Sequence, residues 1–166
     1  MLIKLDIRRI LSYFGIYRVI SMFRGQFIHK IYKTGRISIP SKFRDNLKNK
    51  YKTKNLILTT FENSIICYPL TEWEKLESKI SILPQFKKET VEFQRYLIGN
   101  AHECEIDNEG RIMVPLILRN TFKIKDSAVF IGMLSRFEIW SEKNWKNNKN
   151  TSFNKFQKSR EVINEI

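Results

Sequence analysis

The sequence predicts a mainly β protein with short helices, an α+β fold built from two tandem copies of one unit. Three observations predict it. A Gly-Arg-x-x-x-Pro motif begins at Gly35 and recurs at Gly110. An apolar run typical of a strand lies inside each copy, and further apolar runs follow both copies in the same order. Two copies are too few for a solenoid, so we expect them to pair as one pseudo-symmetric domain.

Each copy of the motif predicts a turn, a strand and the start of a helix. The glycine of each copy lies where a tight turn needs a positive φ. The runs at 37–39 and 112–114 suit short strands, and Pro40 and Pro115 suit the first position of a helix. We therefore interpret each copy as a hairpin that leads through a strand into a helix.

Further strands are expected upstream and downstream of the motifs. They are 23–32, 55–60, 63–68, 128–131 and 137–140. Trp73 and Trp145 follow the last strand of each copy, and they lie slightly closer together in the chain than Gly35 and Gly110 do. The second copy is therefore slightly shorter than the first between its helix and its next strand.

Two helices are expected to link the copies. Thr71 and Glu74 have the spacing of a capping box, and apolar residues follow at helical intervals until Pro84 ends the pattern. A second helix is expected over 87–98. Residues 146–166 are rich in Asn and Lys with little periodicity, so we interpret them as a loose tail, helical at most near its end.

The N-terminal segment 1–21 mixes apolar and basic side chains and precedes any repeated feature. Its longest uncharged run is Ile10–Tyr17, which is too short for a membrane span, and no small-residue cleavage site follows it. We expect that Met22 is the true start or that 1–21 is a dispensable extension; a basic amphipathic helix on a membrane is the alternative. The expected domain plan is extension 1–21, repeat 26–72, helical linker 73–98, repeat 101–145 and polar tail 146–166.

The formal net charge of +13 favours an anionic partner, nucleic acid or an acidic membrane surface. The charge is uneven: residues 22–50 carry eight basic and one acidic side chain, whereas 99–145 carry six basic and seven acidic ones. The basic surface therefore belongs mainly to the first copy. The only cysteines, Cys67 and Cys104, form no C-x-x-C pair and no disulfide framework, which fits a reducing compartment.

Catalytic and metal sites find little support in the sequence. His102 and Cys104 would share one face of a strand, either as nucleophile and base or as metal ligands, but no further ligand is suitably spaced. The alternating carboxylates at 103, 105, 107 and 109 suit a solvated strand face better than an acid–base or metal site. We expect no catalytic residue, no metal and no cofactor, and hence no enzyme.

The arginines after the two turn glycines are the best candidates for contact with nucleic acid. Asp107 lies four residues before Arg111, so the two can form an ion pair across the turn that either stabilises the turn or orients the guanidinium. The residue matching Asp107 in the first copy is Tyr32. Arg36 is therefore expected to be unpaired and to contact DNA. The candidate DNA-binding residues are Arg24, Lys30, Lys33, Arg36 and Arg111.

Several segments together resemble the MraZ family of bacterial transcriptional regulators. They are 22–25, the Gly-Arg-x-x-x-Pro of both repeats, 68–74, 97–104 with Asp107-x-x-Gly110-Arg111, and 137–140. The resemblance covers about residues 22–145. The family's Asp-x-x-x-Arg signature is intact at Asp107 and Arg111 but keeps only the arginine at Arg36.

The resemblance implies an AbrB/MazE-like swapped-hairpin, double-split β-barrel made by the two tandem repeats. It also implies ring-like homo-oligomers that bind direct repeats in the promoter of their own division and cell-wall gene cluster, usually as repressors. Such proteins reside in the cytoplasm on the nucleoid. The leading hypothesis is a regulator that binds double-stranded DNA. The alternative is an AbrB-fold antitoxin-like interaction module, which usually has one repeat.

Overall fold

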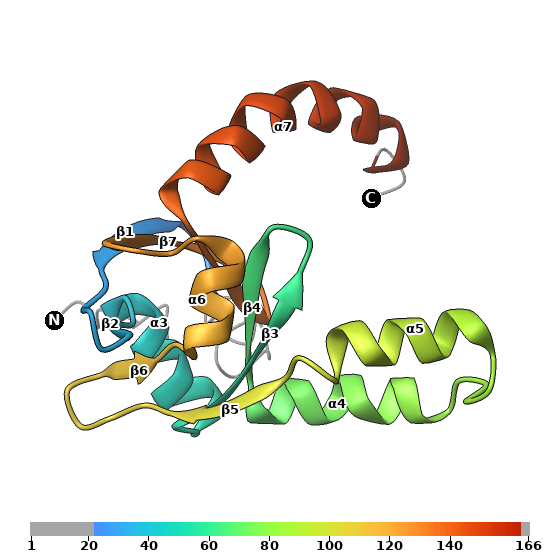
Figure 1. Cartoon of the computed structure of the whole chain (residues 1–166), viewed down its shortest axis with the longest axis horizontal. Helices are drawn as coiled ribbons and strands as arrows, with labels where there is room; N and C mark the ends of the chain where they lie inside the picture. Colours follow the sequence, from blue (N-terminus) through green and yellow to red (C-terminus); the bar gives the residue numbers. More distant parts are fainter. Residues whose placement is uncertain (1–21, 164–166) are drawn as a thin grey trace, which may run out of the picture.

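The computed structural model describes residues 22–163, so the expected extension 1–21 lies outside the described residues. The strands are β1 (Gln26–Lys30), β2 (Arg36–Ser38), β3 (Asn55–Phe61), β4 (Ser64–Pro69), β5 (His102–Glu105), β6 (Arg111–Met113), β7 (Ser127–Met133) and β8 (Arg136–Trp140). The helices are α3 (Ser41–Asn46), the π-helix η1 (Leu47–Tyr51), α4 (Leu70–Ser81), α5 (Lys88–Leu97), α6 (Leu116–Phe122) and α7 (Glu142–Ile163) (Figure 1).

The strands form a six-stranded sheet in the order β1-β7-β8-β4-β3-β5 and a two-stranded sheet of β2 and β6. All named strand pairs are antiparallel. Exchanging the two repeats maps this order onto itself, because β1, β7 and β8 correspond to β5, β3 and β4. The mainly β, two-repeat fold predicted from the sequence is therefore confirmed. The strands expected to form one barrel are arranged in two separate sheets, and the hydrogen-bonded ladder of the described strands does not close.

The first strand of each repeat is exchanged with the other repeat. β1 pairs with β7, and β5 pairs with β3. Backbone hydrogen bonds at the ribbon are reciprocal too: Ile39 N donates to Gly110 O at 3.0 Å, and Val114 N donates to Gly35 O at 2.9 Å. Neither repeat can complete its own sheet alone, so the two fold as one unit.

The hairpin expected around Gly35 has the predicted turn, but the prediction that its two strands pair with each other is wrong. Gly35 and Gly110 do take positive φ values, +92° and +75°, as the turns require. The flanking strands separate after a single bridge between Ile31 and Ile37, and β1 continues along β7 instead. A turn fixes only the local chain direction, and five residue pairs with β7 satisfy the backbone of β1 better than a frayed hairpin would.

The main core contains a cluster of aromatic rings that packs α3 against the sheet. Phe43 of α3 is fully buried, and its ring lies 5.2 Å from that of Phe23 and 5.2 Å from that of Phe137. Phe23 also stacks on Tyr51 at 5.6 Å. Packed aromatic rings favour defined relative orientations. The core therefore fixes α3 and η1 against the strands that precede and follow them.

The linker helices α4 and α5 pack as a pair beside β3 and extend away from the sheet (Figure 1). Trp73, Ile80 and Leu97 form a small buried cluster with Ile57 of β3. The expected capping box is absent, because α4 begins at Leu70 directly after Pro69 and its N-cap makes no side-chain hydrogen bond. The local signal was overridden by the proline, whose φ is already suited to a helix start.

The expectation of a loose tail after residue 145 is wrong, since α7 runs from Glu142 to Ile163. This helix leaves the sheet after β8 and projects from the body of the molecule (Figure 1). Its frequent lysines favour a helix even without a strong apolar stripe. None of the helices in the described part of the chain is both long and apolar enough to span a membrane.

Candidate nucleic-acid interface

The β2–β6 ribbon brings the two motif arginines onto one outward face. Ile37 and Ile112 are paired across the ribbon and buried at 0% and 1% exposure, so they point into the core. Because side chains alternate along a strand, the other residues point outward. These outward residues are Arg36 opposite Met113 and Ser38 opposite Arg111. The two arginines therefore lie diagonally across a short antiparallel ribbon, a juxtaposition that the sequence alone did not predict.

Arg111 is held by carboxylates at its own turn. Asp107 Oδ2 accepts from Arg111 Nε at 2.9 Å, and Asp107 Oδ1 accepts from the backbone amides of Glu109 and Arg111, both at 2.9 Å. The guanidinium also pairs with the carboxylate of Glu109. The backbone and side-chain hydrogen bonds from Arg111 lower the pKa of Asp107, while the bond to Asp107 raises the pKa of Arg111. The pair fixes the direction of the Arg111 guanidinium.

Arg36 has the same backbone setting without the carboxylate. Tyr32 N donates to Arg36 O at 2.9 Å, just as Asp107 N donates to Arg111 O at 2.9 Å. The turn geometry is therefore kept although Tyr32 replaces the acidic residue. Arg36 is exposed, and within residues 22–163 its side chain makes no ion pair. The guanidinium of Arg36 is available to an external anion.

Two arginines missed in the list of candidates tie the repeats together behind the ribbon. Arg44 Nη1 donates to Glu109 O at 3.3 Å. Arg119, its counterpart in the second repeat, donates from Nε to Val114 O at 3.1 Å and from Nη1 to Lys33 O at 3.4 Å. The signal was present in the sequence, because both arginines close the repeated motif. Each one packs on the turn glycine of the other repeat.

The remaining basic candidates are not all close to the ribbon. Lys33 lies in the turn before β2, and Lys30 ends β1 next to the Ile31–Ile37 bridge. Both are exposed. Arg24 precedes β1, about 20 Å from Lys30 at the usual rise of a strand. The structure thus brings Lys30 and Lys33 to the ribbon turn and puts Arg24 at the opposite end of β1.

His102 and Cys104, the two residues considered for nucleophilic or metal chemistry, both lie on β5, which pairs with β3. Cys104 lies opposite Leu56 on β3. Burial raises the pKa of the Cys104 thiol to about 12 and that of Cys67 well above its ordinary value, the reverse of what an activated thiol requires. Within the described part of the chain no group of three or more His, Cys, Asp or Glu residues could hold a metal ion.

Comparison with known proteins identifies the family. A family model described as "MraZ protein, putative antitoxin-like" matches residues 22–96 and again 97–164. The chain belongs to the MraZ family. The boundary between the two matches lies at the end of α5, before the second repeat begins with β5.

Curated MraZ relatives match most of the chain. A "Transcriptional regulator MraZ" of Syntrophobacter fumaroxidans is 42% identical over 123 residues, which cover 74% of this chain and 81% of that protein. The protein of the same name from a Thermoanaerobacter species is 38% identical over 146 residues, 87% of this chain and 99% of that protein. Another, from Shewanella violacea, is 35% identical over 143 residues, 86% of this chain and 90% of that protein.

Proposed function

We propose that this chain is a sequence-specific DNA-binding regulator of transcription whose β2–β6 ribbon contacts double-stranded DNA. The observation that carries the proposal is the shared outward face of Arg36 and Arg111 on that ribbon. A two-stranded ribbon fits the major groove, and an arginine fork can bind O6 and N7 of guanine together. The names of the MraZ relatives, transcriptional regulators, support the same reading.

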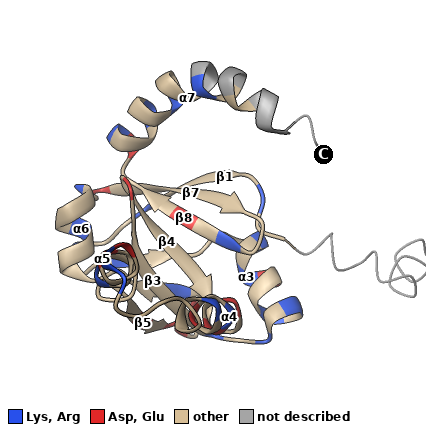
Figure 2. Ribbon diagram, turned by 90° about the vertical axis from the view of Figure 1, so that its right-hand side faces the viewer, with Lys and Arg blue, Asp and Glu red and all other residues tan. Residues whose placement is uncertain are grey.

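The two arginines have different roles in this proposal. Arg111 is oriented by Asp107, which suits a directed contact to a base edge. Arg36 has its full charge available, and Lys30 and Lys33 lie close to it in the chain, which suits contact with guanine or with phosphate. Figure 2 shows further basic segments along α3 and α7. The positive charge supplies affinity, and the ribbon supplies specificity.

From the family resemblance we further propose the target and the assembly. The chain acts as a ring-like homo-oligomer that binds direct repeats in the promoter of its own division and cell-wall gene cluster and represses it. It works in the cytoplasm, associated with the nucleoid. A surface for self-association is the tip of the α4–α5 pair, where Ile82 is 83% and Phe86 fully exposed. Linked ribbons in such a ring raise avidity for repeated sites.

The test is a binding assay with the DNA upstream of the protein's own gene. The full chain is titrated, at several salt concentrations, against that fragment and against a scrambled fragment of the same length. We expect affinity for the native fragment to be about 10³-fold or more higher, as for specific DNA-binding proteins. Arg36→Ala should weaken binding to the native fragment, and it should also reduce this ratio if Arg36 contacts a base, whereas Lys79→Ala on α4, an exposed lysine of the linker, should change neither. Equal affinity for both fragments would overturn the proposal.

A second candidate is an antitoxin-like interaction module, and the projecting helix α7 is the observation that favours it (Figure 1). Segments outside a compact body can fold around a protein partner. A pull-down with the full chain and with a chain ending at residue 141 separates the candidates. Capture of a small toxin by the full chain alone would favour this function; DNA binding without any such partner favours the regulator.

A further inference from the structure

The two repeats differ at one place in the fold, just after the helix of the motif. In the second repeat α6 ends at Phe122, and Lys123 takes a left-handed conformation that leads directly to β7. In the first repeat α3 continues into the π-helix η1, and only then does Lys52 take the left-handed conformation. The additional length of the first repeat is accommodated here. The additional turn carries basic residues that the second repeat lacks.

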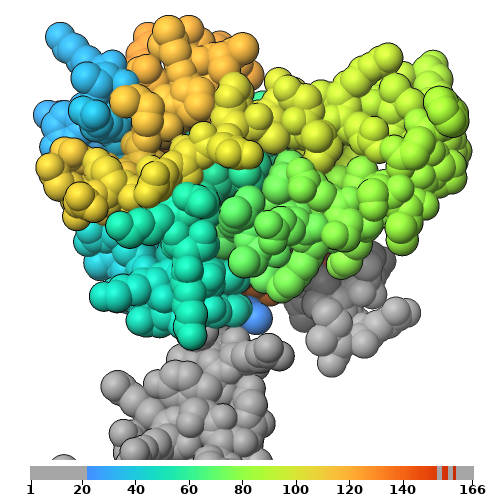
Figure 3. All heavy atoms as spheres, turned by 90° about the horizontal axis from the view of Figure 1, so that it is seen from below, coloured from blue at the N-terminus to red at the C-terminus, as the bar shows by residue number. Residues whose placement is uncertain are grey.

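This additional turn forms one wall of a groove of about 700 Å³, and the β5–β6 turn of the other repeat forms the opposite wall. In the space-filling view these two segments, teal and yellow, lie side by side (Figure 3). Two hydrogen bonds hold the walls together: Ile106 N donates to Lys54 O at 2.9 Å, and Arg44 Nη1 donates to Glu109 O at 3.3 Å. The groove is therefore part of the folded domain.

The charged lining of the groove is mainly basic. Arg44, Lys48, Lys52 and Lys54 face two acidic residues, Asp45 and Asp107. Asp107 already accepts three hydrogen bonds from its own turn, two of them from Arg111. Within residues 22–163 the ammonium groups of the three lysines have no hydrogen-bond or ion-pair partner. Asp45 also lines the groove, but among the described residues it forms no ion pair with these lysines. The lining therefore offers three ammonium groups that are not paired with a carboxylate.

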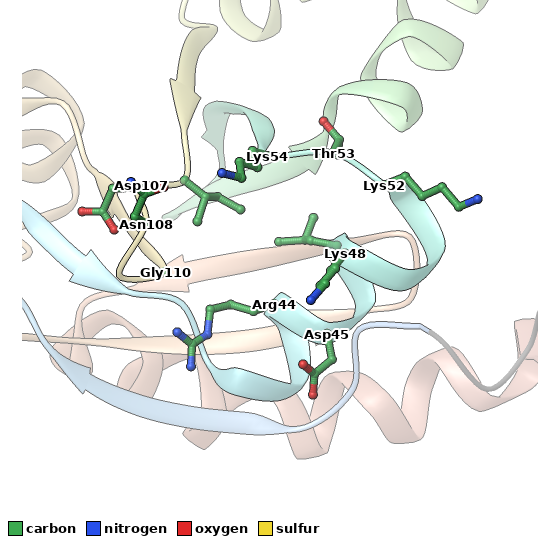
Figure 4. A pocket seen from close by; sticks show the side chains of 11 residues that line it. Arg44, Asp45, Lys48, Lys52, Thr53, Lys54, Asp107, Asn108 and Gly110 are labelled. Carbon is green, nitrogen blue, oxygen red and sulfur yellow. The ribbon is translucent and has the colours of Figure 1, made fainter.

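Several of the basic side chains lie around the same space, so that one ligand could contact them together. In Figure 4, Lys48 and Lys54 extend into the space between η1 and the turn at Gly110, and Arg44 lies along its lower side. Lys52 projects outward at the rim. The floor includes Leu47 and Ile106, which are 1% and 8% exposed. An apolar floor lowers the local dielectric constant and strengthens the attraction of the cations for an anion.

We propose that this groove is a phosphate-binding site, lined by Lys48, Lys54 and Arg44, that takes a phosphodiester of the DNA backbone or the phosphates of a free polyphosphate. Lysine ammonium groups and an arginine fork are the donors that phosphate oxygens favour. Binding of a DNA phosphate in the groove rests on the proposed function, in which DNA lies on the β2–β6 ribbon. The groove adjoins the turn that leads into β6 at Arg111. DNA lying on the ribbon would carry a backbone strand past this turn. The groove would add affinity on one side of the ribbon only.

The test uses the full chain with Lys48→Gln and Lys54→Gln combined. Glutamine keeps helix propensity similar at position 48, and the backbone hydrogen bond of Lys54 is unaffected by its side chain. The matched control combines Lys79→Gln and Lys88→Gln, two exposed lysines of the linker helices α4 and α5 that do not line the groove, with the same change in charge. Both proteins are titrated with promoter DNA over a range of salt and, by calorimetry, with inorganic tripolyphosphate. Melting curves show that each variant folds.

The slope of log K against log salt is negative, and we expect it to become less steep by about 1.8 in the groove variant, about 0.9 for each lost phosphate contact. The control should change it by much less. An unchanged slope with loss of tripolyphosphate binding would assign the site to a free polyphosphate. A groove variant that matches the control in both assays would overturn the proposal. If the unmodified chain does not discriminate promoter DNA, the proposed function fails, while the tripolyphosphate titration still tests the groove.

Discussion

Replacing Gly110 with alanine should destabilise the domain by acting on both repeats at once. The φ of Gly110 is +75°, a left-handed backbone that costs an ordinary residue about 1–2 kcal/mol. A Cβ there would also overlap Nη1 of Arg44 and lie 2.6 Å from its Cδ. Arg44 must move, and its hydrogen bond to Glu109 O is lost, a further loss of about 0.5 kcal/mol for an exposed contact.

The total of about 1.5–2.5 kcal/mol corresponds to a melting temperature about 3–10 °C lower for a chain of this size. The assay is thermal and denaturant unfolding of the variant. Gly25→Ala is the matched control, because its φ is +95° but its Cβ would meet only the Phe27 ring, at 3.4 Å. The control should show the backbone cost without the displacement of an arginine.

Adding Arg44→Ala to Gly110→Ala isolates the contact between the repeats. Removing the arginine relieves the overlap, so the double variant should be less destabilised than the sum of the single variants by about 0.5–1 kcal/mol. Strict additivity would refute the reasoning, because it would mean that Arg44 does not pack on the turn of the other repeat. A Gly110→Ala variant as stable as the unmodified chain would refute the turn geometry itself.

Four further predictions concern function and assembly. Arg36→Ala should weaken promoter binding by about 1–3 kcal/mol, roughly 5- to 150-fold in Kd, and more than Arg111→Ala, whose effect should fall more on the melting temperature; equal affinity losses with unchanged melting would contradict this. Because Arg111 and the turn amides lower the pKa of Asp107 from its ordinary value of 3.8, its contribution to stability is complete above pH 3.8 and disappears as the pH falls through the folded pKa. Asp107→Asn should therefore lose stability at neutral pH and differ least from the unmodified chain in acid unfolding curves. Removing residues 1–21 should leave cooperative unfolding and DNA binding unchanged, since both repeats follow them; loss of either would show that they belong to the domain. Light scattering should give a mass several times 19.9 kDa that Phe86→Ser decreases, whereas a monomer that still binds repeated sites tightly would exclude the ring.

Features set by neighbouring residues could be predicted from the sequence. The positive φ of Gly35 and Gly110 followed from the need of a tight turn for glycine. The strands near 55–60 and 63–68 followed from apolar runs on either side of a polar turn, and they pair as β3 and β4. The position of α5 followed from helical spacing. In each case the signal and the structure lie within a few residues of each other.

Features that depend on distant partners could not be predicted in this way. Strand periodicity does not specify which strand is the neighbour, so the exchange of β1 and β5 could not be predicted from it. Only the family resemblance implied that exchange. The shared face of Arg36 and Arg111 depends on that exchange and on the register of β2 with β6. The helix α7 was missed for another reason. It has little apolar periodicity, so its helical state depends on the helix propensity of residues such as its lysines and not on an amphipathic pattern.

The central claim is that DNA lies on the β2–β6 ribbon, and hydrogen–deuterium exchange of the full chain with and without its promoter DNA tests it most directly. DNA that covers the ribbon face should slow amide exchange in 32–38 and 107–113. The linker helices α4 and α5 do not contact DNA in this account, so their exchange should not change through DNA contact. A scrambled fragment at the same concentration is the control. Protection of both ribbon segments by promoter DNA alone is the predicted result. Protection confined to α7 or to the linker helices, with the ribbon unchanged, would contradict the account.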